Sequence, residues 1–87
     1  MKESYQIYGT LTCGYCERSK ILLDINDIEY TYTDITNLNG EEKVRLMEIA
    51  NKKFQTVPQI FQRTSTGLEY VGGYTELDIK INGGLKL

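Results

Sequence analysis

The residues best suited to chemistry in this 87-residue chain are its two cysteines, Cys13 and Cys16, in the stretch "LTCGYCERSKILL". Two thiols at this spacing can form a redox couple, half of a metal site or a small structural staple. Residues i and i+3 of a helical turn share a face and lie within the ~4.4–6.8 Å Cα separation that a disulfide needs. The pair can therefore change between dithiol and disulfide with little movement of the backbone.

The placement of the two thiols predicts unequal roles. Cys13 falls at the start of a predicted helix, where free N–H groups and the helix dipole stabilise a thiolate. Cys16 lies one turn inside and is expected to be packed. We interpret Cys13 as a nucleophile and Cys16 as a resolving thiol. The alternatives are inert packing, which is common for cysteine, and metal binding. A closed zinc site needs four ligands, so this histidine-free chain would require a second subunit or an external thiol.

Composition excludes several other functions. The formal charge of −2 and the lack of a basic cluster larger than Lys52-Lys53 argue against nucleic-acid binding. The opening "MKESYQIYG" lacks the ~7–15 apolar residues of a signal peptide, and no run approaches the ~20 residues of a membrane span. We expect a cytoplasmic protein in a reducing compartment, where a lone cysteine pair is not a permanent staple.

The cysteines need a strand and a helix to position them. "YQIY" (Tyr5–Tyr8) reads as a strand closed by Gly9, and helical spacing follows from about Cys13 to Asp24, with Thr12 as the expected N-cap. "IEYTYTDI" (Ile28–Ile35) alternates and is typical of a strand.

The second half of the chain continues the alternation. Asn39 and Glu42 resemble a capping box, and Leu46, Ala50 and Phe54 predict one apolar helical face. The remaining expected elements are an apolar strand within Gln55–Phe61, a turn at Thr64–Gly67, a strand at Leu68–Val71, and a short helix through Tyr74, Leu77 and Ile81 ended by Gly83-Gly84. The order β-α-β-α-β-β-α predicts a single α/β domain, residues 1–87. It has a mixed four-stranded sheet and helices on both faces.

Three separated stretches, "IYGTLTCGYCERSKILL", "TVPQIF" and "VGGYTEL", resemble those of glutaredoxins, small members of the thioredoxin-fold superfamily. The resemblance covers nearly the whole chain. In its compact length the chain is similar to the small glutaredoxins of bacteria and phages. It implies a thioredoxin-like fold and a glutathione-dependent thiol–disulfide oxidoreductase. Its substrates would be protein disulfides and glutathione mixed disulfides, with ribonucleotide reductase as a plausible client. The resemblance also implies a monomer that needs no metal or organic cofactor.

The resemblance also implies a binding site for glutathione. Pro58 would follow a cis peptide bond, and the Val57 backbone would pair with the bound peptide as an added strand does. Without the resemblance, a proline that opens a strand is the simpler interpretation. Thr75 would suit the γ-glutamyl carboxylate and Glu76 the ammonium, although both could simply cap a helix. The expected glutathione-binding residues are Tyr15, Gln55, Thr56, Val57, Pro58, Gly73, Thr75 and Glu76.

The chain departs from the family pattern at three positions. Thr10 and Gln55 stand where basic residues are frequent, which would leave a glutathione carboxylate to Lys52 or Lys53 or weaken that contact. Gly14 stands where proline is common. Some members with a small residue there hold a [2Fe–2S] cluster between two subunits, with glutathione supplying two thiolates. A cluster-bridged dimer acting as carrier or sensor is therefore the alternative function.

Overall fold

The computed structural model describes residues 4–83. Within them the elements follow the predicted order, with one added turn of 3-10 helix. The elements are β1 (Ser4–Gly9), α1 (Gly14–Ile25), β2 (Glu29–Asp34), η1 (Ile35–Asn37), α2 (Gly40–Ala50), β3 (Gln59–Thr64), β4 (Gly67–Gly72) and α3 (Tyr74–Asn82).

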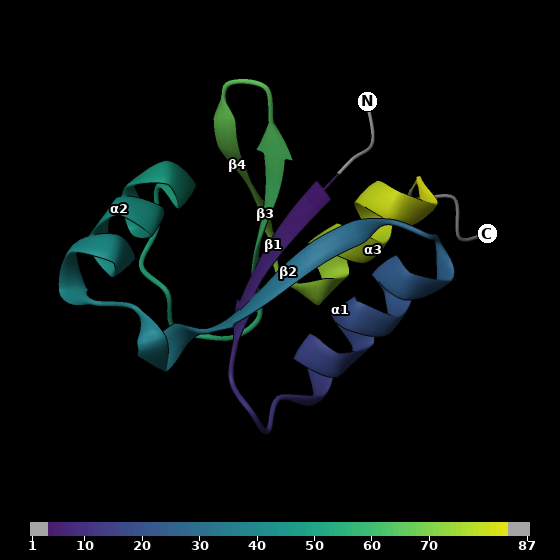
Figure 1. The fold of residues 1–87 in the computed structure, drawn as a ribbon, viewed down its shortest axis with the longest axis horizontal. Coiled ribbons are helices and arrows are strands. Elements are labelled where there is room, and N and C mark those ends of the chain that lie inside the picture. The colour runs from purple at the N-terminus through teal and green to yellow at the C-terminus, as the bar shows by residue number, and fades with distance from the viewer. Residues whose placement is uncertain (1–3, 84–87) are drawn as a thin grey trace.

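The strands form one mixed sheet in the order β2-β1-β3-β4 (Figure 1). β1 pairs in parallel with β2 and antiparallel with β3, and β3 and β4 form an antiparallel hairpin. Ile7 lies at the centre, opposite Tyr32 on one side and Ile60 on the other. The predicted mixed four-stranded sheet is confirmed.

Helices cover both faces of the sheet, as predicted. α1 and α3 lie together on one side and α2 on the other (Figure 1). The core beneath α1 and α3 contains Tyr5, Ile7, Leu22, Leu23, Ile60 and Leu77. Successive strand residues point to opposite faces, so Phe61 faces the α2 side, where its ring meets those of Tyr8, Phe54 and Tyr70.

One part of the predicted α2 face is wrong. α2 ends at Ala50 because Asn51 adopts a left-handed conformation with φ 58°, so Phe54 lies outside the helix. Its ring still packs 6.2 Å from that of Phe61. The capping box at Asn39 and Glu42 is present with both hydrogen bonds.

One other boundary differs, and one is confirmed. The predicted strand to Ile35 stops at Asp34, whose carboxylate accepts hydrogen bonds from the Thr36 backbone and hydroxyl and so begins η1. Gly83 ends α3 as predicted, as a C-cap with φ 68°; Gly84, the second residue of the predicted stop, lies outside the described residues.

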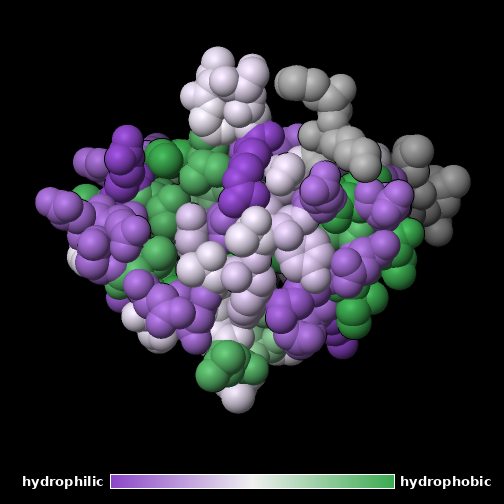
Figure 2. Space-filling model, viewed as in Figure 1, coloured by the Kyte–Doolittle hydropathy of each residue, from purple (hydrophilic) through white to green (hydrophobic). Residues whose placement is uncertain are grey.

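Much of the face shown in Figure 2 is hydrophilic, with hydrophobic side chains in smaller groups between. In the loop between β1 and α1, the Leu11 side chain is 86% exposed. No helix among the described residues is long and apolar enough to cross a membrane.

Candidate functional site

Cys13 occupies the N-cap of α1, and its sulfur accepts a hydrogen bond from an N–H group of the first helical turn. The Cys16 backbone N–H donates to Cys13 Sγ at 3.1 Å. This corrects the prediction that Thr12 caps the helix: the sulfur itself takes the place of a capping oxygen. A sulfur in that position lies at the N-terminus of the helix, where the dipole favours negative charge, so the position of Cys13 suits a thiolate.

Cys13 and Cys16 are joined as a disulfide, with 5.2 Å between their Cα atoms. That separation is inside the predicted range, so the spacing argument is confirmed. Cys13 is half-buried, whereas Cys16 is fully buried against the sheet. An incoming disulfide can reach only the first sulfur without rearrangement of the fold.

A cleft of about 280 Å³ lies beside the cysteines. Its walls come from the start of α1, the loop before β3 and the start of α3. The lining residues are Tyr15, Thr56, Val57, Pro58, Gly73, Tyr74, Thr75 and Glu76. Seven of the eight residues predicted to bind glutathione therefore share one cleft, and only Gln55, which is exposed, lies outside the lining set.

The loop before β3 connects the cleft to Cys13. The Val57–Pro58 peptide bond is cis, as the resemblance implied, and β3 begins one residue later, so the proline also opens a strand. The Val57 carbonyl oxygen lies 3.6 Å from Cys13 Sγ. Gln59, 2% exposed, holds this loop, since its amide donates to the Thr56 carbonyl at 2.7 Å and its oxygen accepts from the Tyr70 hydroxyl at 2.6 Å.

Aromatic rings form the far wall of the cleft. The rings of Tyr15 and Tyr74 lie 5.9 Å apart, and the Arg18 guanidinium lies 5.2 Å from the centre of the Tyr15 ring. Such a cation over an aromatic face is attracted by the ring quadrupole, so Arg18 helps to hold Tyr15 at the rim.

Glu76 already has a structural role at the start of α3. Its carboxylate accepts a hydrogen bond from the Gly73 backbone N–H at 2.7 Å. The same turn depends on Gly72, which has φ +132° and no room for a Cβ beside the Glu76 side chain. The capping alternative for Glu76 is therefore observed. Glu76 is exposed, and its carboxylate has further lone pairs that can accept hydrogen bonds from a ligand.

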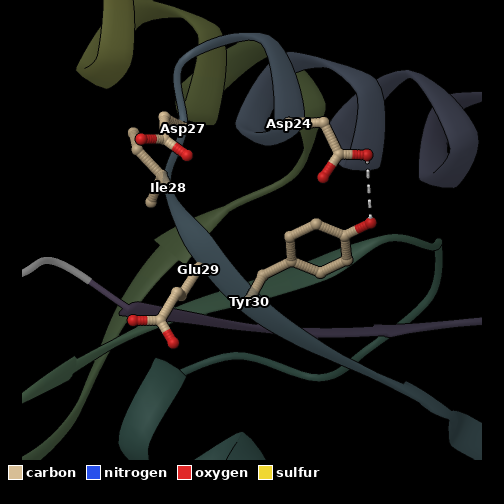
Figure 3. Close-up of a pocket in the computed structure, with 5 residues that line it drawn as sticks. All are labelled: Asp24, Asp27, Ile28, Glu29 and Tyr30. Carbon is tan, nitrogen blue, oxygen red and sulfur yellow. Dashed lines mark hydrogen bonds between the residues drawn. The ribbon is translucent and has the colours of Figure 1, made fainter.

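A second hollow, of about 500 Å³, lies at the opposite end of α1 (Figure 3). It is lined by Asp24, Asp27, Ile28, Glu29 and Tyr30. The Asp24 carboxylate points toward the Tyr30 hydroxyl, which donates to it at 3.5 Å (Figure 3). The lining contains neither cysteine and lies at the far end of α1 from them, so the smaller cleft is the candidate active site.

Comparison with known proteins agrees with this geometry. The glutaredoxin family model matches residues 6–65. The chain belongs to the glutaredoxin family. Glutaredoxin 1 of Escherichia coli K12 is 37% identical over 75 residues, covering 80% of this chain and 82% of the relative. Glutaredoxin 1 of Rickettsia prowazekii is 40% identical over 55 residues, covering 63% of this chain and 57% of the relative.

A solved glutaredoxin structure is similar over nearly the whole chain. Reduced E. coli glutaredoxin gives a TM-score of 0.70 at 33% identity, covering 94% of this chain and 96% of that one. The thioredoxin-like fold is confirmed, and with its Cys-x-x-Cys pair this chain is a dithiol glutaredoxin, an enzyme of the thiol–disulfide oxidoreductase class.

The two lysines suggested for a glutathione carboxylate do not line the cleft of this glutaredoxin. Lys52 and Lys53 line a different hollow beside α2, and the Lys52 ammonium lies 5.8 Å from the centre of the Tyr70 ring.

Sequence reasoning missed Tyr74 as a cleft residue and Gln59 as a residue that supports the cleft. A polar side chain inside the apolar run "PQIF" was the available signal for Gln59, because a buried amide needs partners. Within residues 4–83 no group of three or more His, Cys, Asp or Glu side chains could hold a metal ion, and nothing in the comparisons points to the iron–sulfur alternative.

Proposed function

We propose that this glutaredoxin uses Cys13 as nucleophile and Cys16 as resolving thiol. The observation that carries the proposal is the hydrogen bond from the Cys16 N–H to Cys13 Sγ at the start of α1. It stabilises negative charge on the sulfur that is also the more exposed of the pair.

The reaction follows from these positions. The Cys13 thiolate attacks one sulfur of a substrate disulfide, and the other substrate sulfur leaves as a thiolate. Cys16 then attacks Cys13 Sγ, which releases the second substrate thiol and forms the Cys13–Cys16 disulfide. Two glutathione thiols return two electrons to that disulfide and become oxidised glutathione. Glutaredoxin potentials of about −200 to −230 mV lie within reach of the glutathione pool.

Glutathione is proposed to occupy the cleft beside Cys13, because glutaredoxins use it as a co-substrate. The Val57 backbone would pair with the peptide, and the start of α3 would receive its γ-glutamyl end. The hydroxyl and backbone N–H of Thr75 would suit the carboxylate there, and the exposed side of the Glu76 carboxylate would suit the ammonium. Tyr15, Thr56, Pro58 and Gly73 complete the contact surface.

The wider setting follows from the family resemblance. Residues 1–87 would form one glutaredoxin domain that acts as a monomer in the cytoplasm. Its substrates would be glutathione mixed disulfides and protein disulfides, among which that of ribonucleotide reductase is a candidate.

Two serine variants test the assignment. Cys13→Ser should abolish glutathione-coupled reduction of every disulfide substrate. Cys16→Ser should retain exchange with small glutathione mixed disulfides, which needs one thiol, and lose most reduction of protein disulfides. Activity that survived in Cys13→Ser would show that the nucleophile is wrongly assigned.

A paired assay tests the reductant. The oxidised protein is offered either glutathione with its reductase or a thioredoxin-type reducing system, and the rate of disulfide reduction is compared. Glutathione should support turnover. Reduction by the second system alone would contradict the glutathione site and leave the two cysteine roles intact.

A further inference from the structure

The hydroxyl group of Tyr32 lies at the base of the active-site loop. Tyr32 is on β2, on the face of the sheet that α1 covers. Its hydroxyl donates a hydrogen bond of 2.6 Å to the carbonyl oxygen of Thr10, in the loop that leads to Cys13. The Lys20 ammonium lies 3.9 Å from the centre of the Tyr32 ring, so the ring is held from the α1 side as well.

The Tyr32 hydroxyl and the buried Cys16 sulfur both lie close to Gly9. A Cβ atom added at Gly9 would overlap both the Tyr32 hydroxyl oxygen and Cys16 Sγ. The two atoms therefore converge on the same small space beside the Gly9 Cα. Cys16 is fully buried, so a polar oxygen at that point matters to the state of its sulfur.

We propose that Tyr32 is a positioning residue for Cys16: in the dithiol form the Cys16 S–H donates a hydrogen bond to the Tyr32 hydroxyl oxygen. The Tyr32 O–H group continues to donate to the Thr10 carbonyl oxygen, and a lone pair of the phenol oxygen accepts a hydrogen bond from the Cys16 S–H group. The inference rests on the proposed role of Cys16 as the resolving thiol.

This hydrogen bond acts on one redox form only. Oxidation of the dithiol by oxidised glutathione transfers two electrons and two protons and gives the Cys13–Cys16 disulfide and two glutathione thiols. The disulfide has no S–H, so the bond to Tyr32 stabilises the dithiol alone. It also favours a protonated Cys16 beside an ionised Cys13. Because a protonated thiol is a poor nucleophile, Cys16 reacts only after a mixed disulfide has formed at Cys13.

The charges around Tyr32 are compatible with this role. Burial raises the pKa of Tyr32 above its ordinary value; the Lys20 ammonium opposes that shift, and the carboxylates of Glu17 and Asp34 add to it. Tyr32 therefore keeps its hydroxyl proton in neutral solution and remains bonded to Thr10.

The first test compares redox equilibria. Unmodified protein, Tyr32→Phe and Tyr30→Phe are equilibrated with glutathione buffers, and the disulfide fraction is measured after acid quenching. Tyr32→Phe should shift the equilibrium about threefold toward the disulfide, the order expected for one weak hydrogen bond. Tyr30→Phe is the matched control, because its hydroxyl lies on the same strand but bonds to Asp24 at the protein surface.

A merely structural role for Tyr32 predicts a different result. Loss of the hydrogen bond to the Thr10 carbonyl lowers the free energy of unfolding of the dithiol and disulfide forms by the same amount. The redox equilibrium is then unchanged, and only the stability of the protein falls. Tyr32→Phe with reduced stability and an unchanged equilibrium would overturn the proposal.

A spectroscopic measurement observes the bond directly. In Cys13→Ser the chain has a single thiol, so its infrared S–H stretching band belongs to Cys16. The band should move to higher frequency when Tyr32→Phe is added, and an unmoved band would overturn the proposal. If the unmodified protein did not exchange with glutathione at all, the proposed function would fail, while the S–H band would still decide the role of Tyr32.

Discussion

Tyr70→Phe should loosen the cleft without changing any residue that lines it. The Tyr70 hydroxyl donates to the Gln59 side-chain oxygen, and the Gln59 amide donates to the Thr56 carbonyl. This relay connects β4 through β3 to the loop that carries Val57. The phenylalanine ring keeps the contact with Phe61, whose ring centre lies 5.2 Å away, so the substitution removes the hydrogen bond alone.

The burial of Gln59 sets the magnitude. With 2% exposure, its oxygen cannot replace the lost donor with water, and an unsatisfied buried acceptor costs about 1–3 kcal/mol. For a domain of this size each kcal/mol lowers Tm by about 4–8 °C. The Thr56 loop should also lose order, because a Gln59 side chain held at one end only can rotate away. We expect a several-fold higher KM for a glutathione mixed disulfide with kcat nearly unchanged.

Thermal unfolding and steady-state kinetics measure the two effects. Tyr30→Phe is the control, since its weak hydroxyl contact with Asp24 is exposed. A double-mutant cycle isolates the relay: in a Gln59→Leu background the acceptor is already gone, so Tyr70→Phe should cost much less there.

The reasoning fails if Tyr70→Phe matches the unmodified protein in both Tm and KM. It also fails if the Tyr70→Phe cost is the same with and without Gln59, since the hydroxyl would then act through another group.

Three further outcomes follow from the structure. Gly9→Ala places a methyl group against buried atoms and should lower the free energy of unfolding by about 1–3 kcal/mol in urea, whereas Gly14→Ala, whose Cβ would meet nothing within 4 Å, should show no such steric loss. Glu76→Gln retains an acceptor for the N–H that begins α3 and should weaken glutathione binding with little loss of stability; Glu76→Ala should lower both, and unchanged binding in both variants would remove the ligand role. Hydrogen bonds from the Thr36 backbone and hydroxyl lower the pKa of Asp34 below its ordinary value. Its contribution to stability is therefore complete above the ordinary aspartate pKa and lost as pH falls through the lowered value, and an NMR titration of the Thr36 amide with a midpoint at the ordinary value would contradict this.

Local patterns predicted most of the fold correctly. The order of elements follows from hydrophobic period and turn residues, and the cysteine geometry follows from one helical turn, because each depends on residues a few positions apart. Phe54 was assigned to α2 because its spacing continued the apolar face. The left-handed Asn51 ends the helix before it, and tertiary packing against Phe61 explains its apolar character instead.

Contacts between distant segments could not be read from the sequence. Gln59 and Tyr70 meet because β3 and β4 form a hairpin, and Tyr32 reaches Thr10 because β2 lies beside β1. Neither partner can be chosen before strand register is known, since a shift of one residue turns every side chain to the other face. The cleft itself was anticipated only through the family resemblance, which brought three separated stretches together.

The two sulfur atoms have different kinds of neighbour: Cys13 Sγ contacts a backbone N–H group, and Cys16 Sγ lies near the side chain of Tyr32. Cys13 Sγ accepts a hydrogen bond from the Cys16 backbone N–H, a donor that every residue except proline provides. Gly14, between the two cysteines, has open space around it and no left-handed φ. Packing therefore does not require a glycine there, and its effect is confined to the freedom of the turn. The surroundings of Cys16, by contrast, depend on the Tyr32 hydroxyl and on Gly9 leaving room for it. Sequence changes should thus tune the buried thiol more readily than the nucleophile, which lets the redox equilibrium vary while the attacking sulfur keeps its hydrogen bond.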